Sequence, residues 1–186
     1  PGSVGTITGR VVVTVNGKTV NPSGAVRISL VGENLPAAYT NSQGIYNFAE
    51  LPEGVYKLLV QFGDEQIEQR DVEVIAGSTT RPSGVTFTIL TKPPSPRLDT
   101  VEEEDEALIL EYTVMGQGGT PISSFKGTCV RSRYGDVFTA IGASSAVRVE
   151  VTGLRNDEEY ACSVTATNEQ GESAASNVIS GTPRTQ

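Results

Sequence analysis

Cys129 and Cys162 are the only two cysteines in this chain of 186 residues, and the chain contains no histidine. A cysteine or serine nucleophile usually needs histidine as its general base, and histidine is also the commonest zinc ligand. Its absence excludes most familiar hydrolase sites. We therefore predict that the chain has no catalytic residue, no cofactor and no metal centre, and that it is not an enzyme.

An acidic run at Glu102–Glu106 is the densest group of charges in the sequence. Carboxylates of this kind supply oxygen ligands to calcium, and Glu102, Glu104 and Asp105 would be the first candidates. The run lacks the Asp-x-Asp-x-Asp-Gly spacing of a calcium loop. A solvated acidic loop between two strands is therefore the favoured interpretation, and whether it forms a weak calcium site is left open.

Other surface chemistry is sparse. A carboxylate pair can hydrolyse glycosides only if it faces a substrate cleft with one member desolvated, and no pair is marked out here. Carbohydrate-binding sandwiches present aromatic platforms, yet tryptophan is absent. Tyr39 and Tyr134 fall in predicted loops, where we interpret them as turn residues or, alternatively, as contacts for sugar or protein.

The chain is acidic, with a formal net charge of -8 at pH 7. Such a charge disfavours nucleic acid and anionic lipid as partners, because binding would release no condensed counterions. No apolar run approaches the ~20 residues that span a bilayer, and the start of the chain has no targeting pattern. We expect no nucleic-acid partner and no membrane insertion in this segment.

Short runs of alternating apolar and polar residues, each closed by Gly, Pro, Asn or Ser, recur along the chain and predict an all-β fold. Three prolines at 93, 94 and 96 interrupt this pattern and favour an extended, semi-rigid segment. We predict two tandem β-sandwiches: a domain at 1–91, a proline-rich linker at 92–96 and a second domain at 97–186.

The first half is similar to a known family. Its informative stretch is TNSQGIYNFAELPEGVYKL at 40–58, preceded by GTITGRVV at 5–12 and by VRISL at 26–30 after a small-residue turn. These residues resemble carboxypeptidase regulatory-like and collagen-adhesin B-type domains. The resemblance implies a prealbumin-like sandwich that acts as a spacer, stabiliser or protein-binding module in extracellular proteins.

Some adhesin relatives carry a spontaneous bond between a lysine and an asparagine, and this chain lacks the lysine for it. The first strand offers Arg10 among valines, and Lys18 falls in an expected turn at Asn16-Gly17. An isopeptide bond needs a desolvated amine, whereas a turn lysine stays solvated. We therefore expect no such cross-link.

The second half has six alternating runs and a shorter one at 97–101, about the seven strands of an immunoglobulin-like sandwich. Its segment LRNDEEYACSVTATNEQGES at 154–173 resembles the end of a fibronectin type III domain. The resemblance makes Tyr160 the structural corner tyrosine, whose hydroxyl bonds the upstream backbone. The tryptophan usual on the second strand is missing, and Leu110 or Tyr112 takes its place.

The fibronectin-like topology would make the strands of Cys129 and Cys162 neighbours, and alternation turns both side chains toward one core. This resemblance implies a cross-strand disulfide, which would place the protein in an oxidising compartment. The alternative is two buried, reduced cysteines that act as small hydrophobic residues.

These features favour a non-catalytic structural or interaction module that belongs to a larger secreted or cell-surface protein of bacterial type. We expect the module to bind a protein or glycan, which the sequence does not identify. The alternative is a glycan- or peptide-binding accessory region of a secreted hydrolase. An exposed aromatic or hydrophobic patch at one end of a sandwich would favour that alternative.

Overall fold

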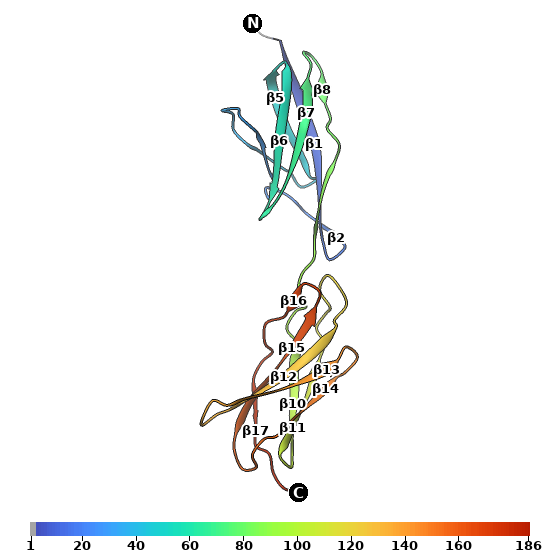
Figure 1. Cartoon of the computed structure of the whole chain (residues 1–186). Coiled ribbons are helices and arrows are strands. Elements are labelled where there is room, and N and C mark those ends of the chain that lie inside the picture. The colour runs from blue at the N-terminus through green and yellow to red at the C-terminus, as the bar shows by residue number, and fades with distance from the viewer. Residues whose placement is uncertain (1–2) are drawn as a thin grey trace. The chain divides into compact units, whose positions relative to one another are not determined.

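The computed structural model describes residues 3–186, and all regular structure in that range is β-strand. The chain forms two compact units, one ending at Ile89 and the other beginning at Leu90 (Figure 1). Each unit consists of two sheets packed around one apolar core. The prediction of an all-β fold with two tandem β-sandwiches is confirmed.

Residues 3–89 of the first unit form nine strands. They are β1 (Val4–Val15), β2 (Lys18–Val20), β3 (Arg27–Leu30), β4 (Ala38–Tyr39), β5 (Ile45–Pro52), β6 (Gly54–Phe62), β7 (Glu65–Val74), β8 (Thr79–Thr80) and β9 (Val85–Ile89).

The long strand β1 organises the first sheet. It pairs antiparallel with β5 and β2, and parallel with β8 and β9. The second sheet is antiparallel in the order β4-β3-β6-β7. Alternate residues of the strands turn inward, as the period-2 pattern predicts, so that Ile28, Leu58 and Val60 are fully buried.

Tyr46 and Gly9 lie opposite each other on β5 and β1 and fit together closely. The Tyr46 side chain is buried, and this desolvation raises the pKa of its phenol to about 12. A Cβ atom at position 9 would overlap the Tyr46 ring. Glycine is required here because the aromatic ring occupies the space of a side chain.

The second unit contains eight strands. They are β10 (Arg97–Glu104), β11 (Ala107–Thr113), β12 (Ser124–Arg131), β13 (Val137–Ala143), β14 (Arg148–Thr152), β15 (Tyr160–Asn168), β16 (Gly171–Glu172) and β17 (Ile179–Gly181).

A three-stranded sheet, β10-β11-β14, faces a second sheet in which β13-β12-β15 are followed by the short strands β16 and β17. A three-stranded sheet against this five-stranded one is an all-β arrangement of the fibronectin type III kind. The core between the sheets contains Leu110 and Tyr112, the two residues expected to replace the missing tryptophan, and both are buried.

The proline-rich segment 92–96 lies within the second compact unit. Pro93 and Pro96 are buried there, and the Thr91 carbonyl accepts hydrogen bonds from the Gly119 amide (2.9 Å) and from Asn168 Nδ2 (3.0 Å). The segment is thus held against the sandwich that follows it.

We predict that Gly9→Ala destabilises the first unit by about 1–3 kcal/mol, because the new methyl group must displace a buried ring. Gly84→Ala is the matched control, since its Cβ would meet no atom nearer than 3.8 Å. It should change stability by no more than about 0.5 kcal/mol. Urea unfolding followed by tyrosine fluorescence measures both, and equal effects would refute the packing argument.

Candidate functional site

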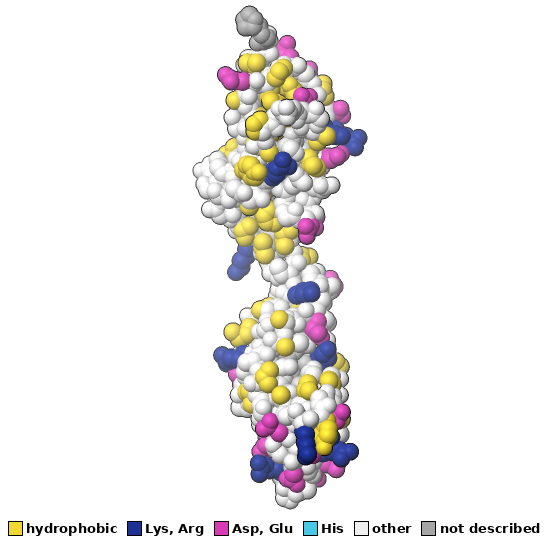
Figure 2. All heavy atoms as spheres, turned by 90° about the vertical axis from the view of Figure 1, so that its left-hand side faces the viewer, with side chains coloured by type: hydrophobic (Ala, Val, Ile, Leu, Met, Phe, Trp, Pro, Cys, Tyr) yellow, Lys and Arg dark blue, Asp and Glu magenta, His cyan; other side chains and the backbone are white. Residues whose placement is uncertain are grey.

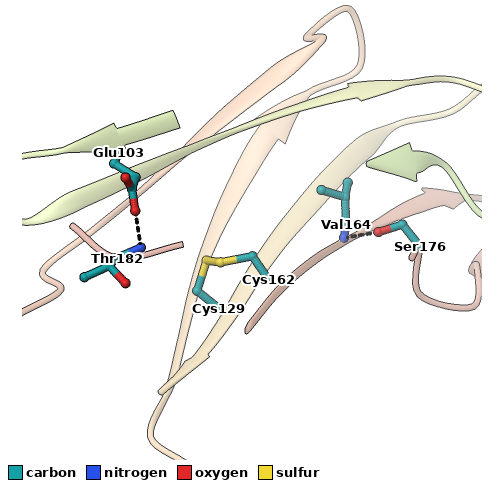
Figure 3. Close-up of a disulfide and its surroundings, with 6 residues drawn as sticks. All are labelled: Glu103, Cys129, Cys162, Val164, Ser176 and Thr182. Carbon is teal, nitrogen blue, oxygen red and sulfur yellow. Dashed lines mark hydrogen bonds between the residues drawn. A yellow bond between two sulfur atoms is a disulfide. The ribbon is translucent and has the colours of Figure 1, made fainter. Parts of the chain in front are cut away.

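A disulfide joins Cys129 of β12 to Cys162 of β15, with 4.1 Å between the Cα atoms (Figure 3). The two residues are directly opposite in the antiparallel ladder. Their Cα separation is typical of a non-hydrogen-bonded pair, in which opposing side chains approach most closely. Both side chains are fully buried, and residues 3–186 contain no free cysteine.

The bridge therefore links neighbouring strands of one sheet, and it does so inside the core. It closes a segment with a sequence separation of 33 residues that contains β13 and β14. Opening the strand pair would require the separation of two covalently joined residues, so the disulfide reinforces the centre of the sheet.

Tyr160 lies at the start of β15 with its ring fully buried. Its Oη accepts a hydrogen bond of 2.9 Å from the backbone N–H of Arg155, five residues upstream. The ring packs edge-on against Phe138, with 5.8 Å between centroids. The structure thus places Tyr160 in the geometry of a tyrosine corner, where one residue anchors the chain entering the strand.

A buried arginine beside this corner was not predicted from the sequence. Arg131, only 9% exposed, donates to Glu158 Oε1 at 2.9 Å and to Asp136 Oδ2 at 3.3 Å. Its guanidinium also lies 4.2 Å from the centre of the Tyr134 ring. The signal was present in the alternation of β12, because Arg131 shares the inward face of Cys129.

This cluster perturbs the titration of Glu158. The hydrogen bond from Arg131 lowers the pKa of the Glu158 carboxyl, opposed by partial desolvation. The same contact with Glu158 raises the pKa of Arg131. Both charged forms are therefore favoured in the folded protein, which is the signature of a structural ion pair.

Between β16 and the last strand, β17, the chain forms no regular strand pairing. Ser173 and Ser176 bond to β15 with their side chains instead. The Ser176 hydroxyl accepts from the Val164 amide at 2.8 Å (Figure 3), and the Ser173 hydroxyl accepts from the Ala166 amide at 3.0 Å. Side-chain oxygens satisfy donors of β15 that a regular strand would pair.

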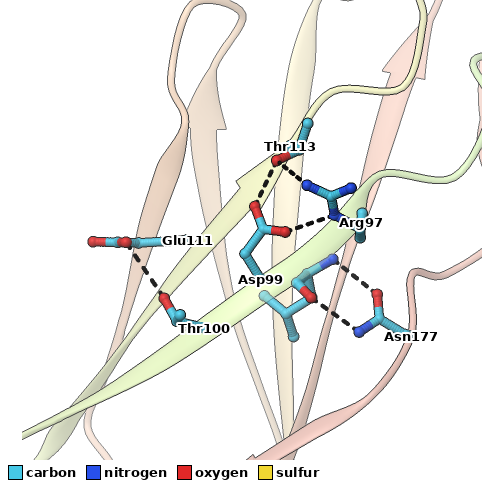
Figure 4. A network of polar contacts seen from close by, with 7 residues as sticks. Arg97, Asp99, Thr100, Glu111, Thr113 and Asn177 are labelled. Carbon is cyan, nitrogen blue, oxygen red and sulfur yellow. Dashed lines mark hydrogen bonds and ion pairs between the residues drawn. The ribbon is translucent and has the colours of Figure 1, made fainter.

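Side chains also secure β10, the first strand of this unit (Figure 4). The Asn177 amide group accepts from the Leu98 N–H and donates to the Leu98 carbonyl, both at 2.9 Å. Asp99 accepts hydrogen bonds from Thr113 and Arg97, and these bonds lower the pKa of its carboxyl in that order of importance.

The expectation of an acidic loop at Glu102–Glu106 was wrong for its first three residues. Glu102–Glu104 belong to β10, and only the next two residues form the turn. The acidic side chains are tolerated because the C-terminal segment supplies donors: Glu103 accepts from the Thr182 N–H at 2.7 Å, and Arg184 Nε lies 3.5 Å from its carboxylate.

Within residues 3–186 no three acidic, cysteine or histidine side chains gather as metal ligands, so Glu102, Glu104 and Asp105 are not brought together as a site. Figure 2 shows positive and negative side chains intermingled at the lower end of the second unit.

The two tyrosines singled out as surface contacts are both exposed. Tyr39 is 55% exposed but lies in the short strand β4 rather than in a loop, because its backbone pairs with Arg27 of β3. Tyr134 is 59% exposed in the turn after β12, where its ring lies against Arg131. Tyr39 belongs to the first unit and Tyr134 to the second.

Lys18 is exposed as the first residue of β2, directly after a turn in which Asn16 and Gly17 both have positive φ (52° and 82°). This is the pattern of a type I′ hairpin turn. The amine of Lys18 is thus outside the core that an isopeptide bond requires.

No protein-family model and no curated protein matches the sequence. Among solved structures, the chain is similar to the FN1-FN3 domains of chicken CNTN1, at 12% identity and a TM-score of 0.45, over 86% of this chain and 55% of that one. A myokine structure matches at 21% identity and a TM-score of 0.44, over 50% of this chain and 100% of that one.

A structure of titin kinase with its flanking domains is similar at 21% identity and a TM-score of 0.44, over 50% of this chain. The match spans only 17% of that longer chain. Likenesses of this strength say nothing about activity, and the fold assignment rests on the strand topology described above.

We predict that the double variant Cys129→Ala/Cys162→Ala loses about 3–4 kcal/mol of unfolding free energy, which is the chain-entropy value for a loop of this length. Urea unfolding of the variant beside the oxidised protein measures the loss. A loss below about 1 kcal/mol would show that the bridge adds little to the paired strands.

A second prediction concerns pH. Folding lowers the pKa of Glu158 below its ordinary value of 4.5, so the charged carboxylate stabilises the fold at pH values above 4.5. This contribution is lost as the pH falls through the lowered pKa of the folded protein. Glu158→Gln should therefore lower Tm at neutral pH and flatten its decline toward about pH 3. Glu159→Gln, at the exposed neighbouring position, is the control and should keep the wild-type slope.

Proposed function

We propose that this chain is a non-catalytic structural and interaction module of a larger extracellular protein, in which it spaces neighbouring parts or binds a protein partner. The observation that carries the proposal is the buried disulfide at the centre of the second sandwich. It supports a role in which the fold must resist unfolding.

The disulfide also supports the proposed location. Bridges of this kind form and persist in oxidising environments such as the cell exterior and are rare in the cytosol. We extend the proposal to a secreted or cell-surface parent protein, and the paired cysteines in a fibronectin-like domain favour a bacterial one. Within residues 3–186 no helix is present that is long and apolar enough to cross a membrane.

The interiors of both sandwiches support a non-catalytic role. Side chains from both sheets fill each core, and two polar clusters, a buried one around Arg131 and an exposed one around Asp99, hold charged groups in paired forms. A catalytic acid or base needs a pKa matched to proton transfer near neutral pH. The pKa values of the Glu158 and Asp99 carboxyls are instead lowered, which keeps both groups charged near neutral pH.

For the first unit we propose a prealbumin-like sandwich of the carboxypeptidase regulatory-like or collagen-adhesin B type. Its support is the motif at 40–58 together with the central position of β1. We further propose 1–91 and 97–186 as the functional domains, with 92–96 as the segment that joins them.

Single-molecule pulling of the full chain tests the structural role. We expect two unfolding events, one for each unit. In the oxidised protein the disulfide should prevent the loop of 33 residues between the cysteines from extending under force. At about 3.5 Å per residue, the event of the second unit should be roughly 115 Å shorter than in the Cys129→Ala/Cys162→Ala variant.

Two outcomes would overturn the proposal. Turnover of any glycoside, ester or peptide in a broad substrate panel, above the rate of buffer alone, would contradict the non-catalytic assignment. Two free thiols in protein alkylated directly in its native setting, seen by intact mass, would contradict the extracellular location.

A further inference from the structure

The strand β13 forms an open edge of the larger sheet in the second unit. Among residues 3–186 it pairs only with β12. The Arg131 N–H donates a hydrogen bond to the Asp136 carbonyl (2.8 Å), so alternate residues from Asp136 onward along β13 bond to β12. The backbone N–H and C=O groups of Phe138 and Ala140 therefore point to β12, whereas those of Thr139 and Ile141 point away from the sheet.

This edge lacks the protection that natural sheets usually give to an exposed strand. Its sequence, VFTAIGA, has no charged residue and no proline, and none of its residues has positive φ. By contrast, the edge strand β7 of the first unit carries Glu65, Glu68 and Arg70, and β5 has positive φ at Glu50 and ends in Pro52.

The other long strand that borders a sheet in the second unit is covered. Along β10 the C-terminal segment lies close enough for the Arg184 N–H to bond the Glu104 carbonyl at 3.0 Å, and Asn177 bonds Leu98 at the other end. Among residues 3–186, no segment bonds in this way to the backbone of Thr139 or Ile141 on the outer side of β13.

The outward side of β13 is apolar. Val137 is 61% exposed and Ile141 is 70% exposed, on the same face as Thr139. The next rows of the sheet continue this face with small or β-branched residues, such as Val130 and Ala161. The salt bridge between Lys126 and Glu172 (3.1 Å) neutralises the charges that border it.

We propose that β13 pairs antiparallel with β13 of a second copy of this chain, about a twofold axis at Ala140. This register pairs all seven residues of the strand. It aligns the outward amide and carbonyl groups of Thr139 with those of Ile141 in the partner, and places Val137 opposite Ala143. Such an isologous contact extends the sheet continuously from one copy to the other.

The chemistry of the strand selects a second copy as the occupant. Self-pairing opposes no like charges, because the strand has none, and Asp136 would face an uncharged Ser144. The exposed aliphatic side chains of one copy would meet those of the other across the new strand pair. A charged extended peptide would find no complementary charge along this edge.

The dimer must be weak. A single strand pair with a few aliphatic contacts buries less than a standard interface of ~1,600 Å², so we expect a Kd on the order of 100 µM. Each chain carries a net charge of -8, and the resulting repulsion is screened by salt. Association should therefore become tighter as the salt concentration increases.

Sedimentation velocity of the oxidised full chain, from about 10 µM to about 1 mM, tests the proposal. We expect the weight-average mass to rise from 19.6 kDa toward twice that value. A mass that stays at that of the monomer over the whole range, at both low and high salt, would overturn the proposal.

Two variants identify the surface. Ile141→Lys adds a like charge to each copy, and Thr139→Pro removes an N–H that points away from β12; each should weaken association at least about tenfold. Ser180→Lys is the matched control, because it adds the same charge on the opposite edge strand of the same sheet. Equal weakening by Ser180→Lys would show that charge, and not the β13 edge, controls association. Circular dichroism and Tm of each variant establish that the fold is retained.

Discussion

The pairing of β12 with β15 is the interaction on which the rest of the second unit depends. The two strands are aligned over eight residue pairs, and the disulfide lies within this ladder. One end carries the buried Tyr160 and Arg131, which fix the turns that enter and leave the strands. At the other end Asn168, almost fully buried, donates from Nδ2 to the carbonyls of Thr91 and Gln117. A single strand pair thus positions both ends of the sandwich.

A different constraint governs the first unit, which has no covalent cross-link among its described residues. Here the twelve-residue strand β1 takes partners along both edges, so that its register positions every other strand of the sheet. Close packing against it leaves no tolerance at Gly9, where the Tyr46 ring occupies the space of a side chain. Backbone pairing and steric fit provide here what the disulfide provides in the second unit.

The surfaces of the two units differ in the way that matters for interaction. Edges that carry charges, a bulge or a covering segment resist addition of another strand, whereas β13 is regularly paired, uncharged and apolar on its outward side. An interaction module recognises its partners through such surfaces, because its interior is filled by its own side chains. The polar clusters at Arg131 and Asp99 stabilise strands and turns of the second unit, and they leave the β13 edge free.

The sequence by itself determined the all-β class, the inward-facing residues of most strands and the common core of the two cysteines, because side chains alternate with period 2 along a strand. It also indicated the turn at Asn16-Gly17, where local backbone preference is sufficient. Only the tertiary structure decided that Glu102–Glu104 extend a strand, that Ser173 and Ser176 replace one, and that Arg131 is buried with two carboxylates. These features depend on donors and acceptors supplied by residues that are distant in the sequence or on another strand, and a local pattern contains no information about which partner will lie within hydrogen-bonding distance.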